Sequence, residues 1–148
     1  MTIIGIDPGL SGGIAFLEPE GTQYATPLLC DGRNLDVISL RELLTDTFNA
    51  RVYIEKPMIM GRQSGALVIG TNYGRILATL ELLRIPYREI TPAQWKKKLL
   101  GKTEGKGAAI ALAKTLFPSV ELVQPGCKVA HDGVAEALLI AEWGRRHG

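Results

Sequence analysis

TIIGIDPG, at residues 2–9, is the stretch that decides the fold of this chain. Its apolar run is typical of a strand that is buried on both faces and therefore lies in the middle of a sheet. Pro8 and Gly9 end the strand directly after Asp7. The sequence thus predicts a carboxylate at the carboxyl end of a central strand, where open α/β sheets bind their ligands. Asp-Pro-Gly is also favourable turn chemistry, so a purely structural interpretation stays open at this point.

The segments that follow predict an α/β fold. Two further strands are predicted at 13–17 and 23–29, on either side of a turn at 18–21, and they would form an antiparallel meander with the first strand at the start of a mixed sheet. The short segments 51–54 and 86–90 are also predicted to be strands. Apolar residues at helical spacing, together with Thr91-Pro92 as a helix start, predict helices at 35–49, 66–83, from 91 onward, at 106–116 and at 132–145.

Length and composition indicate one globular domain spanning residues 1–148. The chain is 46% hydrophobic and 22% charged, and no apolar run approaches the ~20 residues of a membrane span. A strand begins at Thr2, so we expect no signal peptide. Cys30 and Cys127 lie far apart without metal-ligand spacing, which favours two free thiols in a reducing compartment. We therefore expect a cytoplasmic protein.

Charge is distributed unevenly along the chain. Residues 1–50 hold two basic and seven acidic residues, net −5, whereas residues 84–114 hold eight basic and two acidic residues, net +6. This asymmetry predicts one face that meets a polyanionic partner, although a merely solvated basic helix is an equally good explanation of so short a run.

Three further acids extend the pattern that Asp7 begins. Glu55 ends the predicted strand 51–54 just before Lys56-Pro57, and Asp132 and Glu136 lie one helical turn apart at the start of the last helix. As a structural alternative, Asp132 caps that helix and Glu136 is favoured by its dipole. Taken together, four carboxylates suit two divalent cations about 4 Å apart, and oxygen ligands favour Mg²⁺ or Mn²⁺.

Several segments resemble, in order and spacing, the RuvC-type Holliday-junction resolvases of the ribonuclease H-like superfamily, and most closely the small bacteriophage-type members. They are IGIDPG at 4–9, IEKP at 54–57, a glycine-rich helix at 70–75, a basic segment at 92–106 and HDGVAEAL at 131–138. The resemblance implies a ribonuclease H-like fold with a five-stranded mixed sheet, three antiparallel strands and then two parallel ones, flanked by helices.

The resemblance also implies a function. The chain would be a homodimeric, Mg²⁺-dependent endonuclease that makes paired nicks in four-way DNA junctions and leaves 5′-phosphate and 3′-hydroxyl ends. Two Mg²⁺ ions would serve each active site, with Mn²⁺ as a substitute, and the enzyme would work in the cytoplasm of a bacterial cell or a phage-infected host. Its partners would be branched DNA and a second copy of the chain.

By family position, each candidate residue has an expected role. The metal ligands are Asp7, Glu55, Asp132 and Glu136, and Lys106 joins them as a catalytic residue. The expected DNA-binding residues are Met58, Arg62, Lys96, Lys97, Lys98, Lys102, Lys106 and His131. Met58 matches the position of an aromatic wedge, but filling the core is its plain alternative. For His131 a helix-capping or DNA-contact role is favoured over proton transfer.

One departure concerns the helix acids, which the bacterial enzymes usually space i, i+3. Here Gly133 occupies the position three before Glu136. Which acid would contact which metal is therefore open. The rival functions are a nuclease of RNA–DNA hybrids or of branched DNA in general, and an inactive junction-binding protein. An actin-like phosphotransferase shares the IGIDPG motif but needs two such domains, which 148 residues do not hold.

Overall fold

A computed structural model describes residues 1–59, 64–103 and 105–148, with the side chain of Lys106 also left out. Its main sheet has five strands in the order β3-β2-β1-β6-β7. The first three strands are antiparallel, and β6 and β7 continue parallel to β1. This architecture confirms the predicted mixed sheet. The strands are β1 (Thr2–Asp7), β2 (Gly13–Leu17), β3 (Gln23–Pro27), β6 (Ala50–Glu55) and β7 (Tyr87–Ile90).

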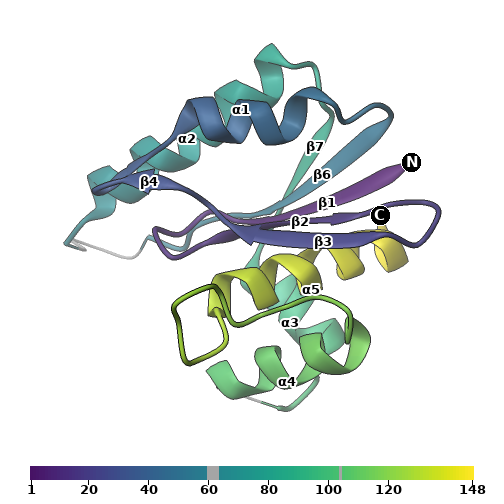
Figure 1. Cartoon of the computed structure of the whole chain (residues 1–148). Helices are drawn as coiled ribbons and strands as arrows, with labels where there is room; N and C mark the ends of the chain where they lie inside the picture. Colours follow the sequence, from purple (N-terminus) through teal and green to yellow (C-terminus); the bar gives the residue numbers. More distant parts are fainter. Residues whose placement is uncertain (60–63, 104) are drawn as a thin grey trace.

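Helices cover both faces of the sheet, as Figure 1 shows. One face packs against α1 and α2 through a core that includes Ile4, Leu40 and Leu80. The other face packs against α5, with α3 and α4 beyond it. The helices are α1 (Val37–Thr45), α2 (Ala66–Leu82), α3 (Pro92–Leu99), α4 (Lys106–Leu116) and α5 (Asp132–His147). None of the helices within the described ranges combines the length and the apolar character that a membrane span requires.

Helix α5 packs closely on the central strand. A Cβ atom placed on Gly5 of β1 would lie 2.1 Å from the carbonyl oxygen of Ala137 and 2.4 Å from the backbone nitrogen of Ala141. Only glycine lets the two backbones approach this closely. The contact therefore sets the height of α5 over β1, and with it the position of the helix acids relative to Asp7.

The region before α1 differs from the prediction. The helix begins at Val37, because Asp36 is its N-cap and accepts hydrogen bonds from the backbone nitrogens of Ile38 and Ser39. The residues before it form a small hairpin, β4 (Cys30–Asp31) and β5 (Asn34–Leu35), that was not predicted. The helix ends at Thr45 rather than at 49, so Phe48 lies beyond its end and is 87% exposed.

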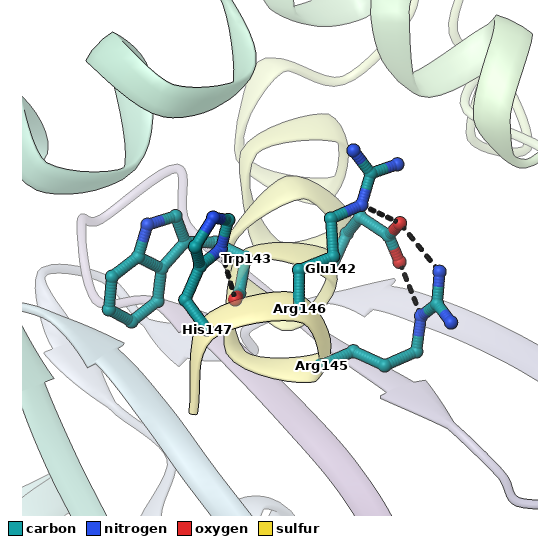
Figure 2. A network of polar contacts seen from close by, with 5 residues as sticks. All are labelled: Glu142, Trp143, Arg145, Arg146 and His147. Atoms are coloured by element: carbon teal, nitrogen blue, oxygen red, sulfur yellow. Dashed lines mark hydrogen bonds and ion pairs between the residues drawn. The ribbon is translucent and has the colours of Figure 1, made fainter.

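The carboxyl end of α5 is held by a buried carboxylate. Glu142 is 2% exposed and accepts hydrogen bonds from both Arg145 and Arg146 (Figure 2). Burial raises the pKa of Glu142, but the bonds from the two guanidinium groups outweigh it and leave the pKa below its ordinary value. On the other side of the helix, His147 stacks on Trp143 with 5.4 Å between ring centroids. Both contacts extend the helix beyond the predicted end at 145.

Candidate metal centre

Three carboxylates from separate parts of the chain converge at one edge of the sheet. Asp7 ends β1 and Glu55 ends β6, and these strands are parallel neighbours, so both acids emerge at the same edge. Glu136 reaches the same point from the first turns of α5. Each of the three offers one oxygen atom, and these atoms lie within 4.8 Å of one another. We call this group the acid cluster.

The electrostatics of the acid cluster favour a bound cation. Burial raises the pKa of Asp7 to about 7, and the charges of Glu136 and Glu55 add to the rise, against the opposing effects of the Gly9 backbone N–H and Lys96. Burial also raises the pKa of Glu55, with Glu136 as a further cause. Three poorly solvated carboxylates repel one another strongly unless a positive charge neutralises them. Because all the donors are oxygens, the cluster fits a hard divalent cation such as Mg²⁺ or Mn²⁺.

Asp132, the fourth predicted ligand, is not a member of the compact cluster among the described residues. It is the first residue of α5, one turn before Glu136, and lines a cavity of about 230 Å³ with Ser11 and His131. The structural alternative, in which Asp132 caps the helix, is wrong. The N-cap is His131, whose Nδ1 accepts a hydrogen bond of 3.1 Å from the backbone nitrogen of Val134. The capping role favoured for His131 is therefore observed.

Helix α3 supplies two neighbouring side chains to the acid cluster. Lys96 Nζ lies 3.6 Å from Glu136 Oε1, and the indole Nε1–H of Trp95 donates a hydrogen bond of 2.5 Å to Glu55 Oε2. The helix starts as predicted, with Pro92 in its first turn. Thr91 and Gln94 form a capping box, in which each side chain bonds the other residue's backbone nitrogen. The predicted start of this helix at Thr91-Pro92 is therefore confirmed.

A groove runs from the acid cluster along the basic segment. It has a volume of about 590 Å³ and lies between α3, residues 101, 103 and 105, and α4. Glu136 lies at one side of it, and Lys96 and Lys97 contribute the positive charge. We call this cavity the basic groove. Its lining residues are Ala93, Lys96, Lys97, Leu100, Gly101, Thr103, Gly105, Ala109 and Glu136.

The structure describes only some of the other predicted DNA-binding residues. Lys98 and Lys102 are exposed and are not among its lining residues. Lys106 is the first residue of α4, but its side chain lies outside the described part of the chain, as does Arg62 altogether. Met58 is 61% exposed, so the alternative that it fills the core is wrong.

Trp95 was not among the predicted site residues. It is completely buried and donates a hydrogen bond to one of the candidate ligands. One signal was present, because Trp95 is a large aromatic residue with a polar N–H group in a helix that is otherwise mostly polar. Nothing in the sequence pairs that group with Glu55, which lies forty positions earlier.

Two solved structures are similar to this one over almost its whole length. A structure of Thermus thermophilus RuvC aligns with a TM-score of 0.67 and 21% identity, covering 99% of this chain and 96% of that one. The structure of T. thermophilus RuvC in complex with a Holliday junction substrate aligns with a TM-score of 0.68 and 17% identity, covering 99% and 97%. The chain has the RuvC fold. No family model matches the sequence, and neither does any curated protein.

The RuvC fold explains why the three acids meet. Its central strand carries Asp7, the parallel strand beside it carries Glu55, and the helix that packs on that central strand carries Glu136. The same fold places α3 directly after the edge strand β7, so that Trp95 and Lys96 face the cluster. The site is thus built from segments distributed over most of the chain.

Proposed function

We propose that this chain is a metal-dependent endonuclease that resolves four-way DNA junctions by paired nicks, leaving 5′-phosphate and 3′-hydroxyl ends. The observation that carries the proposal is an acid cluster, with three oxygens within 4.8 Å, at the edge of a basic groove. The RuvC fold supports it, because one structure with this fold is a complex with a Holliday junction substrate. We further propose that residues 1–148 act as a single nuclease domain.

Asp7, Glu55 and Glu136 would hold Mg²⁺, with Mn²⁺ as a substitute and with Asp132, one turn away, completing a site for two ions. Divalent ions held there would neutralise charge on the attacked phosphate and activate water for hydrolysis. The acids would hold the ions in place, and the burial that raises the pKa of Asp7 keeps bulk water from screening the charge of the carboxylates.

The lysines of α3 would hold the DNA backbone beside the acid cluster. Lys96 and Lys97 line the basic groove, and a compact ammonium group suits phosphate oxygens. Contacts of this kind supply affinity without reading sequence, as recognition of a junction by its shape requires. We propose the same role for Lys98 and Lys102, and we assign Lys106 to the phosphate at the cleavage point on the resemblance alone.

Paired nicks require two active sites, and α2 offers a surface for a second copy of the chain. No atom of the described residues would lie within 4 Å of a Cβ atom on either Gly70 or Gly74, and both glycines are exposed. This glycine face is therefore turned away from the sheet. Leu67, one turn before Gly70, is 83% exposed. We propose that two α2 helices pack through this face in a homodimer.

The experiment that tests the function is cleavage of a set of end-labelled DNAs at matched salt. Four-way junctions, three-way junctions, flaps, duplex and an RNA–DNA hybrid would each be incubated with Mg²⁺, Mn²⁺ or Ca²⁺. Symmetric nicks confined to the four-way junction in Mg²⁺ support the proposal. Cutting of flaps or hybrids with equal efficiency supports the broader nuclease instead. Tight junction binding without cleavage in any metal would show an inactive binding protein.

A further inference from the structure

The bond between Trp95 and Glu55 joins a fully buried donor to one oxygen of a carboxylate in the acid cluster. The indole Nε1 lies 2.5 Å from Glu55 Oε2, which is shorter than the usual N–H···O separation of about 2.7–3.2 Å. Trp95 is 0% exposed, so no water competes for the donor. A carboxylate has two oxygens, and a bond that fixes one of them orients the other.

The donor is held on a rigid frame that includes Glu55 itself. Glu55 pairs with Ile90 in the parallel β6–β7 ladder, and the backbone nitrogen of Lys56 donates to the Ile90 carbonyl at 2.7 Å. From Ile90 the chain enters α3 at once through the capping box of Thr91 and Gln94. The path from acceptor to donor is thus short and hydrogen-bonded throughout, which leaves the indole little freedom to move.

Burial alone does not produce such a pairing, as the other tryptophan shows. The chain has two tryptophans, and both belong to the same core cluster against α5. Trp143 is 6% exposed, and its Nε1 has no hydrogen-bond partner within the described part of the chain. Figure 2 shows it beside His147 at the far end of α5. Trp143 is therefore a natural control for a buried indole without a carboxylate partner.

We infer that Trp95 is a positioning residue for the metal centre. Its hydrogen bond fixes one oxygen of Glu55 and leaves the other turned to the cation. This inference rests on the proposed metal site and adds a residue to its support. Partners that orient a metal ligand typically contribute about 10- to 100-fold to metal affinity. Lys96, the next residue of α3, contacts Glu136, so one short helix contacts two of the three acids.

The test uses the indole N–H signals in ¹H–¹⁵N correlation spectra of the full chain. Two tryptophans give two signals, and W143F assigns the remaining one to Trp95. We expect the Trp95 signal to shift when Mg²⁺ is added and to shift again in E55Q, while the Trp143 signal stays in place. A Trp95 signal that ignores both Mg²⁺ and E55Q would overturn the inference. This measurement leaves Trp95 itself unchanged, so it stands even if variants at that position fold poorly.

Metal affinity, measured by calorimetry without DNA, supplies the second readout. We expect W95F to bind Mn²⁺ about 10-fold more weakly than the wild type, and W143F to bind it equally well. A folded W95F with unchanged affinity overturns the positioning role. If the wild type binds no Mn²⁺, or if Asp7→Asn binds it equally well, the proposed metal site fails. The response of the Trp95 signal to E55Q would then still show the bond itself.

Discussion

Gly133 of α5 lies directly against Gly12 of the turn between β1 and β2. The two residues form a parallel bridge, and a Cβ atom on Gly133 would lie 2.7 Å from the Cα atom of Gly12 and 2.1 Å from the Ser11 carbonyl oxygen. No side chain fits between these backbones. The residue three before Glu136 is therefore a glycine for a steric reason, and the acid that precedes it in the chain stands one full turn from Glu136.

Replacing Gly133 by alanine should lower both stability and metal affinity. The added methyl group forces α5 away from the β1–β2 turn. Overpacking of this kind typically lowers the free energy of unfolding by about 1–3 kcal/mol. The same shift moves Glu136 relative to Asp7. Urea denaturation and calorimetry with Mn²⁺ measure the two effects. Gly107→Ala on α4 is the control, because no atom in the described part of the chain would lie within 4 Å of a Cβ atom there. It should stabilise the chain by up to ~1 kcal/mol, and a Gly133→Ala variant as stable as this control would contradict the steric argument.

Asp7→Asn should abolish cleavage and leave junction binding intact. The substitution removes one negative oxygen from the acid cluster but no charge from the basic groove. We expect a loss of at least about 100-fold in nicking rate, the scale of losing one electrostatic stabiliser of a transition state. A gel-shift assay in EDTA and a nicking assay in Mg²⁺ separate the two functions. Nicking at the wild-type rate would remove Asp7 from the mechanism.

The metal-free protein should lose stability as pH rises from about 4 to 8. Asp7 has a pKa of about 7 in the folded chain, above the ordinary aspartate pKa of 3.8. The folded state therefore binds this proton more tightly than the unfolded state. This contribution to the free energy of unfolding is complete below the pKa of Asp7 in the unfolded chain. It is lost as pH rises through the pKa of Asp7 in the folded chain, with a slope of up to ~1.4 kcal/mol per pH unit.

Urea denaturation in EDTA at several pH values measures this dependence. Asp7→Asn should flatten it between pH 4 and pH 8 and should be more stable than the wild type at pH 8. Mg²⁺ should recover the stability of the wild type at pH 8 and not that of the variant. Identical pH profiles for the two proteins would show that Asp7 is not protonated in the folded chain.

Lys97→Ala should weaken junction binding and reduce its salt dependence. Lys97 lines the basic groove without the contact to Glu136 that complicates a variant of Lys96. Loss of one phosphate contact should lower the slope of log affinity against log salt by about 0.9. Fluorescence anisotropy in EDTA over a range of salt concentrations measures the slope. Lys114→Ala, an exposed lysine of α4 outside the groove, is the charge-matched control and should leave the slope unchanged.

Gly70→Leu should convert the proposed dimer to a monomer without unfolding it. The side chain would enter open space in the single chain but would block the approach of a second α2 helix. Light scattering after size-exclusion chromatography reports the mass. Gly107→Leu places the same side chain in open space on α4 and should remain dimeric. A Gly70→Leu variant that remains a dimer, as Gly107→Leu should, would show that the dimer contact lies elsewhere.

The parts of this structure that sequence predicts well are those with strong local signals. Apolar runs stopped by Pro8 and by Lys56-Pro57 predicted where β1 and β6 end, and so placed Asp7 and Glu55 at the same edge of the sheet. Thr91-Pro92 predicted the start of α3, where a capping box forms. In each case a residue or two determine the backbone geometry without help from distant segments.

Features that depend on distant contacts were not predictable in the same way. The hairpin of β4 and β5 has two residues in each strand, which is too short for an apolar pattern. The bond from Trp95 to Glu55 depends on the β6–β7 register and on the rotation of α3. His131 rather than Asp132 caps α5: its backbone is extended, and its Nδ1 accepts a hydrogen bond from the backbone nitrogen of Val134.

The close seating of α5 on Gly5 has a consequence for synthesis of the protein. The ribosome makes α5 more than a hundred residues after β1, yet the two backbones touch in the folded chain. A nascent chain in which α5 has not yet been made can hold at most the two strand carboxylates, without Glu136. Assembly of the cluster therefore waits for α5, and a polypeptide that stops before α5 does not contain it.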